Sequence, residues 1–238
     1  MKNIVLSLNN VGLNLPDVSH HILKNISCDI HDGDFIILLG HNGCGKSSLL
    51  KVLDRRYQMT QGEVLLYGKR LETYSPAQLA KQVITLTQDP RESLFPSLTV
   101  LENCILVSPQ TRRSFFLDYL YQFNKNLVTK LDTVVSKLSG GEQQALVLAL
   151  TILHPPKILL LDEHTSALDP QAAITLMATT SQIVRKHHIT CILSTHDLNL
   201  ALNYGEKILV LADGKLAHSI DFEQKKNLNT QDLLRVCY

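Results

Sequence analysis

The segment Gly40-His41-Asn42-Gly43-Cys44-Gly45-Lys46-Ser47 decides how the rest of this sequence is interpreted. It follows an apolar run, Phe35–Leu39, and leads into the helical spacing of Ser47–Leu53. Glycines let successive backbone N–H groups turn toward one anion, and the helix that follows adds the positive end of its dipole. The order of strand, glycine loop and helix therefore predicts a cradle for the phosphates of a nucleotide.

Two side chains of this loop add what the backbone cannot supply. Lys46 can reach the β- and γ-phosphates, and the Ser47 hydroxyl is placed to ligate Mg²⁺. A glycine-rich turn that merely carries a lysine is the alternative, and the correct flanks on both sides argue against it. Cys44 is interpreted as a small residue, although an exposed thiol beside a helix dipole could also be reactive. The predicted nucleotide contacts of the loop are Gly40, Asn42, Gly43, Cys44, Gly45, Lys46, Ser47 and Ser48.

A second segment, Ile158-Leu159-Leu160-Leu161-Asp162-Glu163, ends a buried strand in two carboxylates. The carboxyl ends of parallel strands share one crevice, so these acids are expected to face the phosphate loop. Asp162 suits the hydration shell of Mg²⁺, and Glu163 is placed to polarise an attacking water. Two acids that merely end a strand at the solvent edge are the alternative, which the phosphate loop makes weak.

The apolar pattern along the chain predicts an α/β fold. Alternating buried strands and helices imply a mostly parallel sheet, preceded by a β-rich N-terminal portion that we expect to be antiparallel. Between about 89 and 153 the spacing becomes helical, which indicates an inserted α-helical subdomain. We expect one domain, 1–238, with an α/β nucleotide-binding core at 1–88 and 154–238 and a helical insertion at 89–153. Strands are expected at 4–8, 11–15, 35–39, 61–68, 83–87, 158–161, 190–194 and 207–212, and helices at 47–53, 99–107, 114–123, 142–153, 171–187, 198–203 and from 230 onward.

Composition excludes several classes of protein. With 23 basic and 22 acidic residues the chain has no field that would draw it onto nucleic acid, so we expect no nucleic-acid partner. No apolar run approaches the roughly 18 residues that span a bilayer, and the N-terminus does not look like a signal peptide. The five cysteines are widely spaced and form no CxxC, which favours reduced thiols and an intracellular protein.

The segment Leu138-Ser139-Gly140-Gly141-Glu142-Gln143-Gln144 precedes a helical pattern. Ser139 is a plausible N-cap, and Glu142 three residues later completes a capping box. Backbone amides at a helix start without bulky side chains form a second anion site. A plain capped helix is the alternative for this segment taken alone.

In this order, the segments resemble the ATP-binding subunits of ABC transporters, and the resemblance covers essentially the whole chain. A glycine loop alone also occurs in kinases and G proteins, whereas LSGGEQQ placed before the acidic strand is highly specific to the ABC superfamily. The resemblance implies a P-loop NTPase core. The matching elements are the loop at 40–47, Gln88 after a strand, LSGGEQQ at 138–144, ILLLDE at 158–163, Ser166-Ala167-Leu168-Asp169, and His196 after the strand 191–195.

The resemblance also implies a mechanism. Two copies would form a head-to-tail dimer with two ATP molecules between them, so that the signature residues Ser139, Gly140, Gly141 and Glu142 act on the ATP held by the partner's phosphate loop. Glu163 would be the catalytic base, and His196 would hold the γ-phosphate and water. Gln88 would sense Mg²⁺ and water at the hinge to the helical insertion, and Asp169 would lie on the loop that communicates between the two sites.

The function that follows is the energising ATPase of a bacterial importer for a small organic solute such as an amino acid. It would use ATP and Mg²⁺ at the cytoplasmic face of the inner membrane, bound to separate transmembrane permease subunits and served indirectly by a solute-binding protein. The alternative is a soluble ABC ATPase of an assembly complex, for example for iron–sulfur clusters. A P-loop kinase is disfavoured by the signature and by the position of Glu163.

Two departures from the family pattern and one candidate for docking complete the predictions. Leu15 stands where most of the family has an aromatic residue that stacks on adenine, so that adenine would rely on apolar contact or on His20 or His21. His164 stands where many relatives have proline. The apolar pair Leu94 and Phe95, fenced by prolines, is predicted to bind the permease; packing of Phe95 inside its own subdomain is the alternative.

Overall fold

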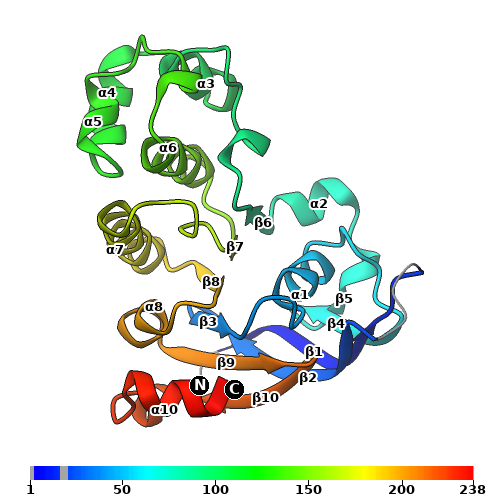
Figure 1. Cartoon of the computed structure of the whole chain (residues 1–238). Helices are drawn as coiled ribbons and strands as arrows, with labels where there is room; N and C mark the ends of the chain where they lie inside the picture. The colour runs from blue at the N-terminus through cyan, green and yellow to red at the C-terminus, as the bar shows by residue number, and fades with distance from the viewer. Residues whose placement is uncertain (1–2, 17–20, 238) are drawn as a thin grey trace. The chain divides into compact units, whose positions relative to one another are not determined.

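The computed structural model describes residues 3–16 and 21–237, so that His20 lies outside the described residues. The chain forms two compact units (Figure 1). The first consists of Met1–Thr85, Lys157–Asp162 and His188–Tyr238, and the second of Leu86–Pro156 and Glu163–His187. Among the described residues, no helix has both the length and the apolar character needed to cross a membrane.

The first unit begins with an antiparallel sheet of four strands, as the sequence predicts, in the order β2-β1-β4-β5. The two strands expected at 4–8 and 11–15 are one strand, β1, because a bulge at Asn10 (φ 51°) shifts the register without ending the pairing. Strand β2 was not predicted, since its buried residues Leu23, Ile26 and Ile30 have helical rather than alternating spacing. The four strands are β1 Ile4–Leu13, β2 Leu23–His31, β4 Gln61–Leu66 and β5 Lys69–Arg70.

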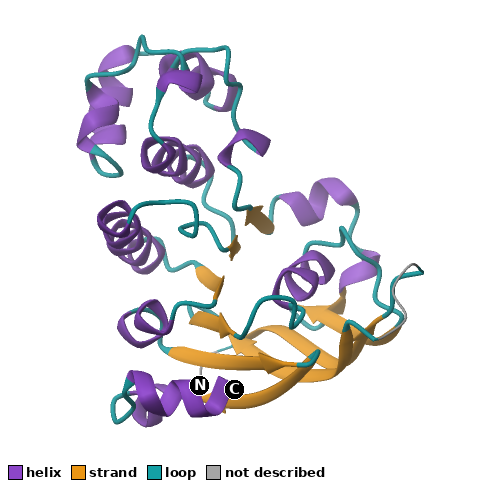
Figure 2. Ribbon diagram, viewed as in Figure 1, coloured by secondary structure: helices purple, strands orange, loops and turns teal. Residues whose placement is uncertain are grey.

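A second sheet has six strands in the order β10-β9-β3-β8-β7-β6 (Figure 2). Strands β7, β8, β3 and β9 pair in parallel and β10 pairs antiparallel with β9, so the prediction of a mostly parallel sheet is confirmed. Both faces of β3 are buried, which explains its unbroken apolar run, and β8 is buried along its whole length although Thr190, Ser194 and Thr195 are polar. The strands are β3 Phe35–Leu39, β6 Val83–Leu86, β7 Ile158–Asp162, β8 Thr190–Thr195, β9 Lys207–Ala212 and β10 Lys215–Ile220.

The helices of the first unit follow its strands. Helix α1 buries Leu49, Leu50 and Leu53 in the same core as the antiparallel sheet, which fixes the loop before it. Among the described residues the helices are α1 Lys46–Leu53, α2 Pro76–Ala80, α8 Leu198–Asn203, α9 Phe222–Lys225 and α10 Thr230–Cys237, with a 3₁₀ turn, η1, at Leu71–Thr73.

The described part of the second unit consists mainly of helices, 3₁₀ turns and the loops that join them. The division of the chain at 89–153 stays a prediction; in the structure the second unit also includes Glu163–His187, because α7 packs on α6. Its helices are α3 Val100–Val107, α4 Arg113–Tyr121, α5 Lys125–Val128, α6 Gly140–Ile152 and α7 Pro170–Lys186, with 3₁₀ turns η2 at Pro90–Glu92 and η3 at Val135–Lys137.

Candidate nucleotide-binding and hydrolysis site

The phosphate loop of the first unit depends on glycine at two kinds of position. Gly43 (φ 83°) and Gly45 (φ 109°) adopt left-handed conformations that other residues rarely take. Gly40 has no room for a side chain, because a Cβ atom there would lie 2.3 Å from the carbonyl oxygen of Leu211. The loop before α1 is therefore held open as a backbone cradle.

The Lys46 side chain is anchored at this loop. It is buried, and Nζ donates to the carbonyl oxygens of Gly40 at 2.9 Å and His41 at 3.1 Å. A buried ammonium group at a helix N-terminus is a strong attractor for phosphate.

Cys44, inside the same loop, is not an exposed thiol. It is buried, and burial raises the pKa of its thiol. A Cβ atom on Gly40 would lie 2.6 Å from the Cys44 sulfur, so the thiol fills space beneath the loop. The interpretation of Cys44 as a small packing residue fits this burial, whereas the reactive alternative assumes an exposed thiol that the structure does not show.

Asp162 at the end of β7 reaches the phosphate loop, as the sequence predicts. Its Oδ1 accepts hydrogen bonds from the Ser47 hydroxyl at 2.9 Å and the Ser194 hydroxyl at 2.7 Å. A carboxylate beside a hydroxyl is a donor set that suits Mg²⁺, which binds protein through one or two carboxylates and leaves other positions to phosphates and water. Ser194 was missed by the sequence predictions, although it stands directly before Thr195-His196 at the end of β8.

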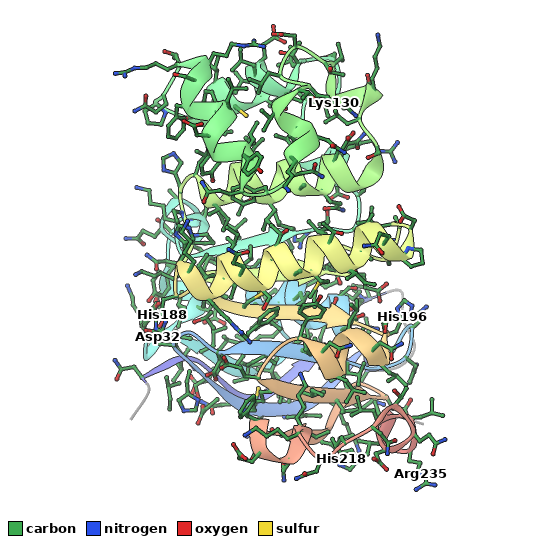
Figure 3. The ribbon with its side chains drawn as sticks, turned by 90° about the vertical axis from the view of Figure 1, so that its left-hand side faces the viewer. Asp32, Lys130, His188, His196, His218 and Arg235 are labelled. Carbon is green, nitrogen blue, oxygen red and sulfur yellow. The ribbon has the colours of Figure 1, made fainter. Side chains whose placement is uncertain are left out.

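His196 follows β8 at the exposed start of the next turn (Figure 3). Its two neighbours are fixed: Thr195 accepts a hydrogen bond from the Asp197 N–H at 3.0 Å, and the Asp197 carboxylate caps α8 through the N–H groups of Asn199 and Leu200. The backbone at His196 is thus anchored on both sides while the imidazole faces outward.

Glu163, the first residue of the second unit's second segment, has an unusual backbone. Its φ is 47°, in the left-handed region that a residue with a Cβ atom adopts at a cost of about 1–2 kcal/mol. Ser166 holds this turn by donating its N–H (3.0 Å) and its hydroxyl (2.8 Å) to the Glu163 carbonyl. Burial lowers the pKa of the next residue, His164, to about 4, so that its imidazole is neutral at physiological pH.

Gln88 is tied to the signature helix by its backbone. The side chain of Gln144, itself buried, donates from Nε2 to the Gln88 carbonyl at 2.8 Å. The sequence predictions named Gln144 only as part of the LSGGEQQ pattern and missed this contact, which joins the segment after β6 to α6.

The signature residues form the capped helix start that was predicted. Ser139 caps α6, its hydroxyl accepts from the Glu142 N–H at 3.4 Å, and its own N–H donates to Glu142 Oε2 at 3.0 Å. Glu142 is buried and also accepts from Lys130 Nζ at 2.7 and 2.8 Å. Burial opposes ionisation of Glu142, but the bonds from Lys130 and Ser139 outweigh it and lower its pKa.

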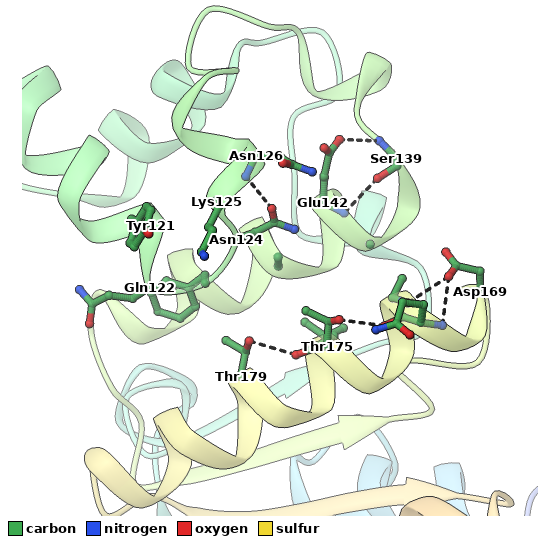
Figure 4. Close-up of a pocket in the computed structure, with 16 residues that line it drawn as sticks. Tyr121, Gln122, Asn124, Lys125, Asn126, Ser139, Glu142, Asp169, Thr175 and Thr179 are labelled. Atoms are coloured by element: carbon green, nitrogen blue, oxygen red, sulfur yellow. Dashed lines mark hydrogen bonds between the residues drawn. The ribbon is translucent and has the colours of Figure 1, made fainter.

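The signature and Asp169 line one cavity within the second unit, of about 560 Å³ (Figure 4). Asp169 caps α7 by accepting from the N–H groups of Gln171 and Ala172. The small size of Gly141 matters here, because a Cβ atom on it would lie 3.3 Å from the Ala172 Cβ. The lining residues that belong to the predicted site are Ser139, Gly141, Glu142 and Asp169.

The predicted site residues thus fall into two groups. The phosphate loop, Asp162 and His196 belong to the first unit, with Ser194 as an addition. Gln88, Glu163, the signature residues and Asp169 belong to the second unit. Within the described residues, no group of three or more His, Cys, Asp or Glu side chains could hold a metal ion.

A phosphate loop, an acid at the end of the neighbouring strands and a capped glycine signature together define a nucleotide-hydrolysing ATPase. Residues 23–166 match the ABC transporter family. The chain belongs to this family and is an ATP-binding ATPase subunit, as the sequence predicts.

Individual relatives give more detail. The chain is 32% identical over 244 residues to the tyrosine transport ATP-binding protein of Clostridioides difficile, covering 97% of both chains. It is 30% identical to the methionine import ATP-binding protein MetN 1 of Lactiplantibacillus plantarum, covering 91% of this chain but only 63% of that relative. Its fold matches cbiO1 of Clostridium perfringens, part of the ABC transporter complex cbiONQ, with a TM-score of 0.82 at 23% identity, over 98% of this chain and 94% of that one.

Proposed function

We propose that this chain energises a membrane importer for a small organic solute, an amino acid being the best candidate. The observation that carries the proposal is the convergence of Ser47, Asp162 and Ser194 beside the phosphate loop, in a chain that also has a capped signature helix. The names of its tyrosine and methionine transport relatives support the solute class.

In the proposed mechanism the first unit binds the nucleotide. The backbone N–H groups of the loop and the α1 N-terminus hold the phosphates, and Lys46 moves its hydrogen bonds from the loop carbonyls to the β- and γ-phosphates. Mg²⁺, when bound, would supply positive charge against the negative charge that develops on the phosphates. Ser47 and Asp162 are the residues that would hold it, and Ser194 keeps the Asp162 carboxylate in one orientation.

Hydrolysis is assigned to Glu163, His196 and Gln88. Glu163 directly follows Asp162 in the chain and accepts the proton of the attacking water, so its strained turn is consistent with a functional constraint. His196 holds the γ-phosphate and the water. Gln88, anchored through Gln144, senses the water and Mg²⁺.

A second copy of the chain completes each site. The start of α6 presents a helix N-terminus and two glycines, which suits the γ-phosphate of an ATP held by the partner's phosphate loop. Asp169, beside the signature in the same cavity, communicates between the two sites. Glu142 differs from this scheme in one respect: it is buried and bonded within its own chain, so that its contribution is to the shape and charge of the helix start.

The permease subunits bind the second unit at Phe95. Phe95 is 57% exposed, whereas its neighbour Leu94 is buried, so that only Phe95 of the predicted pair is accessible. Asn103 fixes the segment by accepting from the Phe95 N–H at 2.9 Å and donating to its carbonyl at 3.1 Å. An exposed aromatic on a fixed backbone suits a helix-in-groove contact. The chain would then lie on the cytoplasmic face of the bacterial inner membrane, and a solute-binding protein would reach the permease from the other side.

Two measurements test this proposal. Cells that lack the chain should lose uptake of at least one member of a panel of labelled amino acids, and the wild-type chain, but not Lys46→Ala, should restore it. The chain should also sediment with membranes. ATP hydrolysis by a chain that stays in the soluble fraction and leaves amino-acid uptake unchanged would instead favour the assembly ATPase.

A further inference from the structure

The ion pair between the partly exposed Lys130 and the buried Glu142 has no assigned role. Lys130 lies in the turn after α5, where its N–H donates to the Leu127 carbonyl and its carbonyl accepts from the Thr133 N–H. The next residue, Leu131, is buried, which restrains the backbone at Lys130. From this turn Nζ contacts both carboxylate oxygens of Glu142, at 2.7 and 2.8 Å.

Glu142 creates an electrostatic conflict at the start of α6. A helix N-terminus attracts anions through its dipole and its unpaired N–H groups. The first turn of α6 nevertheless contains a buried carboxylate that is needed for the capping box with Ser139. Its negative charge would repel a triphosphate, and the low local dielectric makes that repulsion stronger than it would be at the surface.

We propose that Lys130 is a positioning residue of the signature, which neutralises Glu142 so that the start of α6 can accept the phosphates of the partner's ATP. This rests on the proposed function and extends it to a residue nine positions before Ser139. Lys130 touches no nucleotide in this scheme; it acts through Glu142. Binding of the second copy's nucleotide therefore depends on the positive charge of residue 130 and not on the shape of its side chain.

A second lysine supplies a matched control. Lys125 lies on the wall of the same cavity, over the Tyr121 ring at 5.7 Å (Figure 4). It carries the same charge near the signature but, within the described residues, forms neither a hydrogen bond nor an ion pair with Glu142. Lys125→Met and Lys130→Met therefore each remove one positive charge near the signature, and only the second removes the ion pair with Glu142.

The experiment uses the full chain in a Glu163→Gln background, in which hydrolysis is slow and ATP-dependent dimers accumulate. Light scattering against ATP concentration gives the ATP needed for half-maximal dimer. Lys130→Met should raise that concentration about tenfold or more. Lys130→Arg should stay within about threefold of the parent, and Lys125→Met within about twofold. A fluorescent ATP analogue, at chain concentrations too low for dimers, should bind all variants alike, because it reports the phosphate loop of the first unit.

A double variant separates charge from structural damage. If Lys130 acts by neutralising Glu142, then Lys130→Met should have almost no further effect in a Glu142→Gln background. A loss that persists undiminished in that background, or a Lys130→Met chain that dimerises at the parent's ATP concentration, overturns the proposal. If either result is obtained while the Glu163→Gln parent still dimerises with ATP, the proposed function of the chain is retained. A Glu163→Gln parent that does not dimerise at any ATP concentration, together with a wild-type chain that does not hydrolyse ATP, overturns both proposals.

Discussion

Replacing Phe95 tests whether the second unit offers an aromatic anchor to a membrane partner. Phe95 is 57% exposed, so less than half of its surface is buried in the chain. Complete burial of a phenylalanine side chain is worth about 1.5–3 kcal/mol, and the buried part of Phe95 therefore contributes about 1 kcal/mol. For a chain of this size, Phe95→Ala should lower the melting temperature by about 2–4 °C.

The matched control is Phe116 in the same unit, which is 0% exposed. Phe116→Ala should cost about 3–5 kcal/mol and lower the melting temperature several times more. Both are measured on the isolated chain by thermal unfolding. Co-sedimentation with membranes that contain the permease should then weaken for Phe95→Ala by about 2 kcal/mol, or roughly thirtyfold in affinity. A melting temperature as low as that of Phe116→Ala, or undiminished co-sedimentation, would refute the reasoning.

Three further predictions concern the chemistry of the site. Glu163→Gln should retain ATP binding while hydrolysis falls by about 10²-fold or more, with an ATP-bound dimer visible by light scattering; hydrolysis at the wild-type rate would exclude Glu163 as the base. Mixing a Lys46→Ala chain with a Ser139→Ala chain should restore about one working site per mixed dimer, although each parent has none, and no recovery at any ratio would count against a site shared between copies. Ser194→Ala removes a 2.7 Å hydrogen bond to the Asp162 carboxylate, and hydrogen bonds to charged groups are worth about 1.5–3 kcal/mol. This variant should therefore raise the Mg²⁺ concentration for half-maximal hydrolysis several-fold. Ser166→Ala, which removes a hydrogen bond to the Glu163 backbone carbonyl, is the control and should leave that Mg²⁺ concentration unchanged.

Sequence patterns predict those parts of the fold that depend on long, regular apolar runs. The strands β3 and β7 are buried on both faces, and their apolar runs, Phe35–Leu39 and Ile158–Leu161, are therefore easy to find. Strand β2 was not predicted because its buried residues have helical spacing along the sequence. The bulge at Asn10 made the single strand β1 look like two strands. Edge strands and bulges are set by their pairing partners, which local sequence does not reveal.

The candidate site shows the same division between local and distant information. The glycine loop and the capping box are local patterns, and both are present as predicted. Contacts between distant residues were missed: Ser194 with Asp162, Gln144 with the Gln88 carbonyl, and Lys130 with Glu142. Each depends on how elements pack in three dimensions, and a serine, glutamine or lysine has no pattern of its own that marks such a partner.

The left-handed backbone of Glu163 sets activity against stability at a single position. Glycine would relieve the φ of 47° at no steric cost, yet glycine has no carboxylate to accept a proton. Selection of sequences for stability alone would therefore favour glycine at this position, although glycine would abolish the proposed chemistry. Under the proposed mechanism, glutamate at this position keeps the carboxylate that hydrolysis needs and accepts a strained backbone in exchange.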